Sequence, residues 1–343
     1  MTHHPLRLTI DRAALVANWR WLAATANTKC GAAIKADGYG LGACETLAAL
    51  AGAGCRDFFV STWAEAAELG ALPEDASLSV LHGVGPDDVD AALAIDAKPV
   101  LNTAEHVARW RQIAEDRLCD VMVDTGMNRL GLRRDHVGLL DGLEIDICMS
   151  HLACADEDHK LNRTQLSRFF EVREAVFAAR YSLANSAGIC LGRDYSFDLV
   201  RPGLALYGGV PRKEAAGHIT QVACLEAQVI QRRTIGEGES CGYGATYIAD
   251  HATEAAVVNI GYADGYWRGF SSAGGASANG KKLPVLGRVS MDLVILGCDE
   301  AAELLEGDWV EMDYDLRQAS AASGMSQYEL LTGLGDRYER VWR

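Results

Sequence analysis

Short β-like runs alternate with longer helical stretches between residues 30 and 210, and this alternation constrains the fold more than any other feature. The helical stretches, such as Ala43–Gly52, Ala64–Leu72 and Leu161–Arg180, carry apolar residues at the i, i+3 and i+4 spacing of an amphipathic helix. Eight β-like runs recur at intervals of about 20 residues: Ala32–Ala36, Asp57–Ser61, Leu78–His82, Pro99–Asn102, Asp120–Asp124, Glu144–His151, Ser182–Asn185 and Asp198–Tyr207. Alternating strands and helices predict a parallel sheet, and eight units predict a closed (β/α)8 barrel of the TIM type. An open, doubly wound sheet is the alternative.

The pattern changes after about residue 218, where strand-like runs follow one another with turn residues between them. These runs are AQVIQRRTI, GEGESCGYGATY, AAVVNIGYADGYW, KKLPVLGRVSMDLVIL and GDWVEMD. A loop of Ser, Gly and Ala is expected at Ser271–Gly280, and no comparable helix before Ser326–Leu334. The sequence therefore predicts two domains, a barrel over residues 1–217 and a mainly β domain over residues 218–343.

Composition limits the kinds of partner and compartment. The net charge of −15 disfavours binding to nucleic acid or to an anionic membrane surface, both of which favour a basic footprint. The N-terminus lacks the pattern of a signal peptide, and every apolar stretch is far shorter than the roughly 20 residues of a membrane span. The ten cysteines include no CxxC pair, so metal and redox sites are not expected, and most should be buried. We expect a soluble cytoplasmic protein.

Lys35 lies at the end of the first predicted strand, in AAIKADGYG. A barrel carries its active site at the C-terminal ends of its strands, so this lysine is expected to point into the site. Burial beside apolar residues lowers the pKa of a lysine and makes it a Schiff-base nucleophile. A surface lysine with a packed stem is the alternative for this residue alone.

Four more predicted strands end in unusual polar segments: VDTGMNRLGL, SHLACAD, ANSAG and VRPGLALYG. Small residues beside Ser186 and Gly203 would let a phosphate approach backbone N–H groups. Each feature alone has an ordinary alternative. The segments around Ser186 and Gly203 would be tight turns, Arg129 and Arg201 would be surface ion-pair residues, and His151 would be a structural histidine. Their joint placement at strand ends is what indicates a site.

Two segments of the second domain carry further candidates. CGYGATY places Tyr243 between two glycines, which exposes its phenol and allows close approach by another chain. GRVSMD places Met291 and Asp292 at a bend after a β run. A hairpin tyrosine and a core methionine are the ordinary alternatives.

Together these segments resemble the alanine racemase family, enzymes that depend on pyridoxal phosphate (PLP) and combine a barrel with a β domain. The resemblance runs from about Leu8 to the C-terminus, and IKADGYGLG resembles the family's cofactor motif. It implies that Lys35 holds PLP as a Schiff base and that Tyr39 contacts the phosphate. Further phosphate contacts are implied for Ser186, Gly203, Leu204 and Tyr328.

The resemblance also implies roles around the ring and the substrate. Arg201 would contact the pyridine nitrogen, with His151 beside it. Arg129 would bind the substrate carboxylate, assisted by the backbone N–H of Met291. Tyr243 would be the catalytic tyrosine, contributed by the other subunit of a homodimer. The corridor to the site would be lined by Tyr262 and Asp292.

Two positions depart from the family pattern. Many members have a lysine, often carbamylated, where this chain has Met122, so the charge that usually orients the carboxylate-binding arginine is missing. Arg129 would then be oriented by another residue or by an anion such as chloride. The terminal RYERVWR also differs from the common Val-Pro-Arg ending, outside the implied site.

The implied reaction interconverts L- and D-alanine. PLP supplies the electron sink, and two bases on opposite faces exchange the Cα proton. The resemblance assigns Lys35 to the D-enantiomer and Tyr243 to the L-enantiomer. A tyrosine near its free pKa of about 10 is a poor base at neutral pH, so cationic neighbours are expected. A permanently charged arginine keeps the ring nitrogen unprotonated and should disfavour transamination.

Several alternatives stay open. A decarboxylase of the same architecture would not need Tyr243, and a serine or broad-specificity racemase would keep the mechanism. A PLP-binding regulatory protein would not need the second domain, and a cofactor-free Schiff-base aldolase would not absorb near about 420 nm. Substrate breadth and the choice between biosynthesis of D-alanine for the cell wall and alanine catabolism are not decided.

Overall fold

The computed structural model describes residues 3–114 and 116–343. The chain divides into two compact units, which we call the barrel unit and the sheet unit. The barrel unit is Leu15–Thr220, and the sheet unit combines Met1–Ala14 with Gln221–Arg343. The N-terminal segment thus belongs with the C-terminal part of the chain, whereas the expected division after residue 217 grouped it with the barrel.

Parallel strands form the centre of the barrel unit, each hydrogen-bonded to its neighbours in nearly sequential order. The strands are β2 (Lys29–Cys30), β3 (Ala32–Ala33), β4 (Asp57–Val60), β5 (Ser77–Val80), β6 (Lys98–Leu101), β7 (Cys119–Asp124), β9 (Ile145–Met149), β10 (Arg180–Ser182) and β11 (Leu199–Val200), and a short β8 (Leu132–Arg133) pairs with β7. The ring closes through β11, which pairs with β2 on one side. On its other side Arg201 N donates to Ala184 O, 2.9 Å away. The predicted closed barrel is confirmed.

The last predicted strand is shorter than expected. The sequence predicted Asp198–Tyr207, but β11 ends at Val200 and η4 (Leu204–Tyr207) is a 3-10 helix. Pro202 has no N–H to continue the ladder, which gives a physical reason for the early end.

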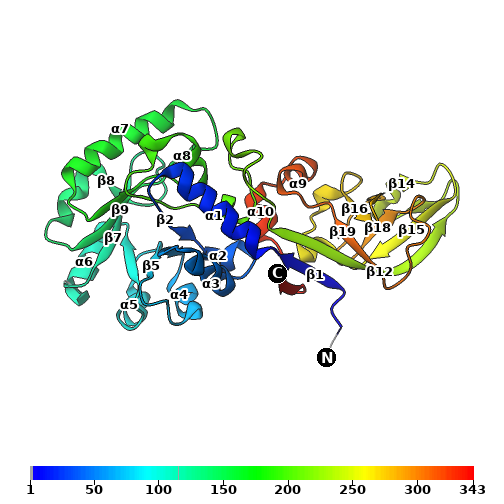
Figure 1. The fold of residues 1–343 in the computed structure, drawn as a ribbon, viewed down its shortest axis with the longest axis horizontal. Coiled ribbons are helices and arrows are strands. Elements are labelled where there is room, and N and C mark those ends of the chain that lie inside the picture. Colours follow the sequence, from blue (N-terminus) through cyan, green and yellow to red (C-terminus); the bar gives the residue numbers. More distant parts are fainter. Residues whose placement is uncertain (1–2, 115) are drawn as a thin grey trace. The chain divides into compact units, whose positions relative to one another are not determined.

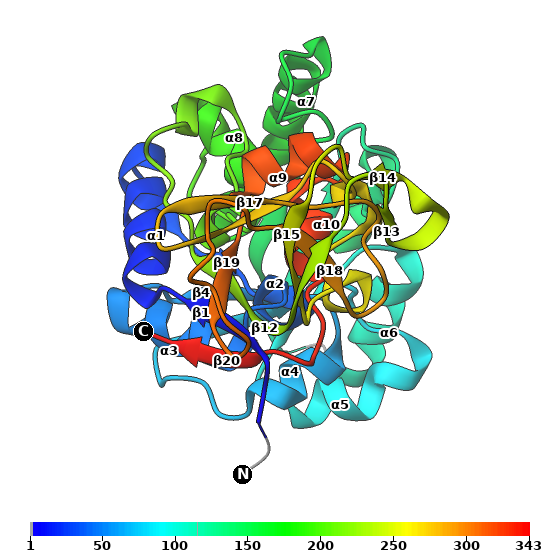
Figure 2. The same cartoon turned by 90° about the vertical axis from the view of Figure 1, so that its right-hand side faces the viewer.

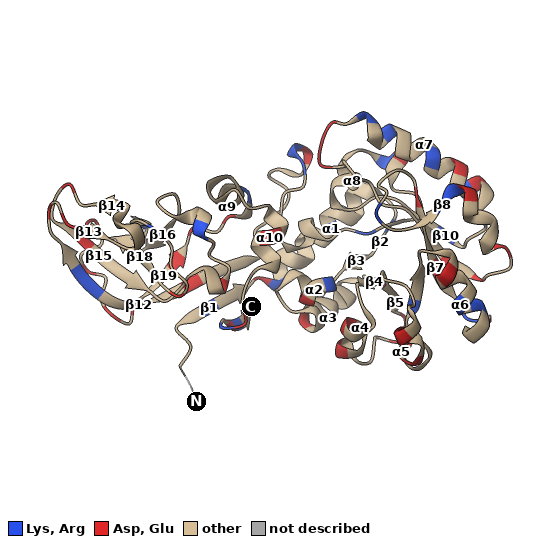
Figure 3. Cartoon of the chain, turned by 180° about the vertical axis from the view of Figure 1, so that it is seen from behind, with Lys and Arg blue, Asp and Glu red and all other residues tan. Residues whose placement is uncertain are grey.

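Helices surround these strands, as Figure 1 shows for α3 to α7. They are α1 (Arg12–Ala26), α3 (Ala43–Ala53), α4 (Trp63–Leu69), α5 (Val89–Ala94), α6 (Ala104–Ala114), α7 (Lys160–Ala175) and α8 (Ser186–Cys190), with 3-10 turns η1 (Pro86–Asp88), η2 (Arg134–Leu140), η3 (Arg193–Tyr195) and η5 (Lys213–Ala215). Figure 3 shows charges of both signs along α7, which is typical of a solvent-facing helix surface.

Charged side chains on the barrel strands form a network of ion pairs, although branched apolar residues are usual at such positions. Lys98 pairs with Asp146, and its Nζ lies 3.5 Å from a carboxylate oxygen of Asp120. Arg180 pairs with both Asp57 and Asp146, each at 2.8 Å. Asp120 is fully buried, so its charge depends on these partners.

The sheet unit is mainly antiparallel and is organised around one long strand, β12. Its first half pairs with β1 and β19, and its second half pairs with β15. Figure 2 turns this unit toward the viewer, with β15 and β18 side by side. The elements are β1 (Leu6–Ile10), β12 (Ala223–Ile235), β13 (Ser240–Cys241), β14 (Tyr247–Ile248), β15 (Thr253–Val258), β16 (Gly275–Ala278), β17 (Lys281–Pro284), β18 (Val294–Gly297), β19 (Trp309–Met312), β20 (Glu339–Trp342), η6 (Tyr243–Ala245), η7 (Tyr262–Asp264), η8 (Arg268–Phe270), α9 (Leu316–Ser323) and α10 (Gln327–Thr332).

Several elements of this unit were not predicted, among them β1, β20, β16 and α9. Strand β16 lies within the expected loop Ser271–Gly280 and pairs with β17 and β19, so pairing outweighs its small residues. Helix α9 buries only Leu316 and Ala319, which is too few apolar positions for a periodic signal. Asp315 caps it by accepting a hydrogen bond from Gln318 N at 2.9 Å.

All ten cysteines are free thiols, five of them buried and only Cys44 exposed. Within residues 3–114 and 116–343, no helix has the length and apolar character needed to cross a membrane.

Candidate active site

Lys35 begins a turn with an uncommon backbone conformation, α2 (Lys35–Tyr39). Ala36, Asp37, Gly38 and Tyr39 have φ values of 53°, 50°, 60° and 57°, a short left-handed turn. Each non-glycine residue in this conformation costs roughly 1–2 kcal/mol, so surrounding contacts must hold it. Strain of this kind is concentrated at functional sites. Burial and the charge of Arg129 lower the pKa of Lys35, while Glu65 opposes the shift.

Glu65, which the sequence reasoning missed, holds this turn. Its carboxylate accepts hydrogen bonds from Ala36 N at 2.9 Å and from Ser61 N at 2.6 Å. Thr62 caps α4 by accepting from Glu65 N at 3.2 Å. The Thr-x-x-Glu spacing is a known capping signal and could have identified this residue. The bond to Ala36 joins helix α4 to the turn α2 and is visible only in the fold.

Three of the phosphate candidates, Ser186, Gly203 and Leu204, lie together after β10 and β11. The hydroxyl of Ser186 accepts from Gly203 N at 2.9 Å and from Ala205 N at 3.2 Å. A Cβ on Gly203 would lie 2.1 Å from the hydroxyl of Tyr39, so only glycine fits there. Leu204 is buried, and its N–H meets no acceptor among the described residues.

Arg201 is buried and forms no ion pair within the part of the chain that is described. Its guanidinium donates to the hydroxyl of Ser182 and to Ser150 O, the latter at 2.6 Å. Burial lowers the pKa of Arg201 to about 10, which still leaves it cationic at neutral pH. Burial, and then the charges of Arg201, Arg129 and Lys35, lower the pKa of His151 to about 3, so this ring is neutral.

Arg129 is exposed after β7, and no hydrogen bond or ion pair to it is found among the described residues. Met122 is buried on the same strand, where the family pattern has a lysine. Among the described residues, we therefore find no side chain that orients Arg129 in place of that lysine. Its charge nevertheless acts on both Lys35 and His151.

Three of the other candidates lie together in the sheet unit. Tyr262 N donates to Ser290 O at 3.1 Å, and Ala263 N donates to Met291 O at 3.0 Å. These bonds join the turn η7 to the bend that contains Met291 and Asp292. Met291 is exposed, and its own N–H has no acceptor among the residues described.

Tyr243 and Tyr328 lie elsewhere in the sheet unit. Tyr243 is 68% exposed on η6, between β13 and β14. The guanidinium of Arg288 lies 3.1 Å from where a Cβ on Gly244 would be, which places a cation beside this turn. Tyr328 is exposed at the start of α10, whose first turn is closed by a capping box between Ser326 and Glu329.

The residues of the barrel unit fit PLP. Neutral donors suit a phosphate, and the hydroxyls of Tyr39 and Ser186 both lie beside Gly203, the residue before Leu204. Arg201 supplies a buried cation without a carboxylate partner, as a hydrogen bond to the pyridine nitrogen requires. Lys35 supplies an amine whose pKa is lowered.

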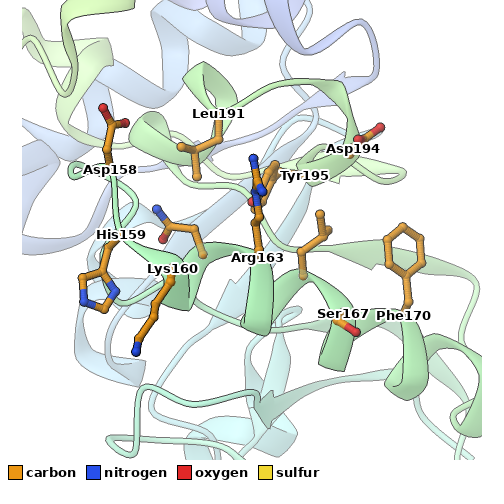
Figure 4. A pocket seen from close by; sticks show the side chains of 11 residues that line it. Asp158, His159, Lys160, Arg163, Ser167, Phe170, Leu191, Asp194 and Tyr195 are labelled. Atoms are coloured by element: carbon orange, nitrogen blue, oxygen red, sulfur yellow. The ribbon is translucent and has the colours of Figure 1, made fainter.

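The barrel unit also has a cavity of about 950 Å³ away from these residues, between the start of α7 and η3. Figure 4 shows Arg163 beside Tyr195 in it, with Asp158, Lys160 and Asp194 around them. No predicted site residue lines this cavity, and its charged side chains are of both signs.

Fold and site together define a class of protein, a PLP-dependent enzyme built from a barrel and a β domain. Family models match nearly the whole chain: the N-terminal domain of alanine racemase over residues 10–211 and the C-terminal domain over residues 222–342. The chain belongs to the alanine racemase family.

Several named relatives are similar over almost their full length. An alanine racemase of Acidiphilium cryptum is 42% identical, covering 99% of both chains. Agrobacterium fabrum has a biosynthetic alanine racemase that is 41% identical, covering 98% of this chain and 94% of its own. Its catabolic alanine racemase is 42% identical, with 98% and 91% covered. The nearly equal identities do not separate the two roles.

A solved structure gives the same result. Alanine racemase from Bartonella henselae, with covalently bound pyridoxal phosphate, is 36% identical and has a TM-score of 0.92, with both chains covered completely. The biosynthetic alanine racemase from Pseudomonas aeruginosa is 32% identical with a TM-score of 0.90, covering 99% of this chain and 100% of its own. The barrel-plus-β fold and the PLP cofactor of this chain are thereby shown.

Proposed function

We propose that this chain interconverts L-alanine and D-alanine by a two-base mechanism in which Lys35 and Tyr243 exchange the Cα proton from opposite faces. The observation that carries the proposal is that Lys35, Arg201, Ser186 and Gly203 all lie at the C-terminal ends of barrel strands. Membership of the alanine racemase family supports the same substrate. PLP, when bound, supplies the electron sink for the charge left at Cα.

Each protein group has a separate task. Lys35 Nζ would hold the cofactor until the substrate amine replaces it there. The freed amine then exchanges the proton on the face assigned to D-alanine, and the lowered pKa of Lys35 favours the neutral form that this requires. The phenol of Tyr243 exchanges the proton on the other face. Arg129 and the N–H of Met291 hold the substrate carboxylate, which fixes Cα between the two bases.

The remaining candidates bind or enclose the cofactor. Tyr39, Ser186, Gly203, Leu204 and Tyr328 hold the phosphate. Arg201 and the neutral His151 lie at the ring, where a cation that keeps its protons leaves the ring nitrogen unprotonated. The corridor to the site is lined by Tyr262 and Asp292.

The working unit in this proposal is a cytoplasmic homodimer in which Tyr243 of one subunit completes the site of the other. Tyr243 is 68% exposed in the single chain, whereas a catalytic phenol must be excluded from water when it acts. A partner subunit that covers Tyr243 would meet this requirement. Within each chain, residues 1–217 carry most of the cofactor-binding residues, and residues 218–343 supply Tyr328 to the phosphate and Tyr243 as the second base. The net charge of −15 supports the absence of a nucleic-acid partner.

The test uses the purified protein with PLP. It should be yellow, lose its band near about 420 nm with borohydride, and convert L-alanine into D-alanine. Racemisation of serine but not alanine would change the substrate and keep the mechanism. Release of CO₂ would identify a decarboxylase and overturn the proposal, as would a protein that binds PLP without any turnover.

A further inference from the structure

We infer that Arg337 is a positioning residue for the substrate carboxylate, because it ties together the two segments that present Met291 and Tyr262. This inference rests on the proposed function and concerns a residue outside the implied site. We call Arg337, Asp264 and Asp292 the Arg337 bridge.

The guanidinium of Arg337 donates hydrogen bonds to two carboxylates. Its Nε donates to Asp264 Oδ1 at 2.6 Å and one terminal nitrogen donates to Asp264 Oδ2 at 2.7 Å. The other terminal nitrogen donates to Asp292 Oδ1 at 2.7 Å. A planar guanidinium can make all three bonds at once, whereas a lysine ammonium cannot reproduce this geometry. Both carboxylates raise the pKa of Arg337, so it stays cationic.

Each end of the bridge belongs to one of the two segments. Asp264 is fully buried and closes η7, where its Oδ2 also accepts from Gly261 N at 2.9 Å. Tyr262 lies two residues before it on the same turn. Asp292 directly follows Met291, whose N–H is assigned to the substrate carboxylate. The bridge therefore links the corridor tyrosine to the carboxylate-binding amide.

The two segments touch so closely that a shift of one must move the other. A Cβ on Gly261 would lie 2.2 Å from Met291 O, so the turn lies directly on the bend. Besides the bridge, the backbone bonds from Tyr262 N and Ala263 N hold this contact. Without Arg337, buried Asp264 loses its cationic partner and Asp292 loses its anchor, which frees the Met291 amide to move.

The variants Arg337→Met, Arg337→Lys and Asp292→Asn test this inference in the PLP-loaded enzyme. Arg337→Met should raise the KM for alanine about tenfold while kcat changes much less, because a binding group is misplaced rather than a base removed. Arg337→Lys keeps the positive charge but cannot bond both carboxylates in the same geometry, so its KM should rise almost as much. Asp292→Asn, which leaves the Arg337–Asp264 pair intact, should raise KM by a smaller factor of about three.

A second readout isolates the carboxylate. Propionate has the size and carboxylate of alanine but no amino group, so its inhibition constant reports on carboxylate binding alone. It should rise in Arg337→Met by the same factor as KM. The visible band of the holoenzyme should stay unchanged. Arg317→Met is the matched control, because this exposed arginine of the same unit has no hydrogen bond or ion pair among the described residues.

The outcomes separate two kinds of failure. A wild-type protein that does not racemise alanine would overturn the proposed function itself. An active wild type whose Arg337→Met and Asp292→Asn variants keep their KM and propionate inhibition would overturn the role of Arg337. Full recovery in Arg337→Lys would also overturn it, since simple attraction of the anionic substrate would then explain the effect. Should Arg337→Met fail to fold, Asp292→Asn carries the test, because its carboxylate lies at the exposed end of the bridge.

Discussion

Arg201 is the side chain whose charge has the most direct chemical consequence. It is buried among neutral acceptors, and its pKa of about 10 keeps it protonated over the working range. If Arg201 contacts the pyridine nitrogen as proposed, it does not give its proton to that nitrogen, and the ring would be a weaker electron sink than a protonated one. A weaker sink favours return of the proton to Cα over its transfer to the cofactor.

Replacing this charge should change the balance of reactions. We expect Arg201→Glu to raise transamination relative to racemisation by about tenfold, or about 1.4 kcal/mol in relative barrier height. The measurement is pyruvate formed per D-alanine formed from L-alanine. Arg201→Lys, which keeps a cation, serves as the control. An unchanged ratio in Arg201→Glu would contradict the assigned role.

At the scale of the barrel strands, the buried pair of Asp120 and Lys98 should affect the free energy of unfolding. Asp120 on β7 is fully buried and accepts from Ser79 on β5 at 2.5 Å and from Ile147 N on β9 at 3.0 Å. Lys98 on β6 is its cationic partner. Removing one partner of a buried pair typically costs 3–5 kcal/mol, because the other charge stays buried and uncompensated.

We therefore expect Lys98→Met to lower the free energy of unfolding of the barrel unit by about 3–5 kcal/mol. Lys29→Met, at an exposed lysine of β2, should change it by about 0.5 kcal/mol or less. Urea unfolding with hydrogen exchange of the barrel-strand amides measures both.

The loss of stability in Lys98→Met should depend on pH. Burial raises the pKa of Asp120, so the folded chain binds more protons than the unfolded chain above the ordinary carboxyl pKa.

The contribution of Asp120 to stability is largest at low pH and is lost as pH rises through its folded pKa. Lys98 lowers that pKa, so the variant should have a still higher one. The destabilisation should then be smaller at pH 5 than at pH 8, because protonated Asp120 needs no cation. A loss that is equal at both pH values would contradict this assignment of charge.

Mixing two inactive variants tests whether the active site is shared between subunits. If Tyr243 completes the site of the partner subunit, Lys35→Ala and Tyr243→Phe should each be inactive, yet a mixed dimer should contain one intact site. Random mixing makes about half of the dimers hybrid, each with one working site of two, so about a quarter of native activity should return. Activity after mixed refolding, with light scattering to establish the dimer, is the measurement. Hybrid dimers without activity would contradict a shared site.

Local sequence determined the repeating units of this protein and the kinds of residue at their ends. Periodicity and short motifs depend on neighbours within one helix or strand, so α3, α7 and the strand-end positions of Lys35 and Arg201 were predictable. The motif IKADGYGLG also indicated the family, which the comparisons establish.

Only the tertiary structure decided the contacts between segments far apart in the chain. Strand β1 pairs with β12 across more than two hundred residues, which assigns it to the sheet unit. Glu65 reaches Ala36 over 29 residues, and Arg337 reaches Asp264 over 73. The physical reason is that such pairs have no local periodicity; they form because a buried N–H or carboxylate must find a partner once the chain is folded.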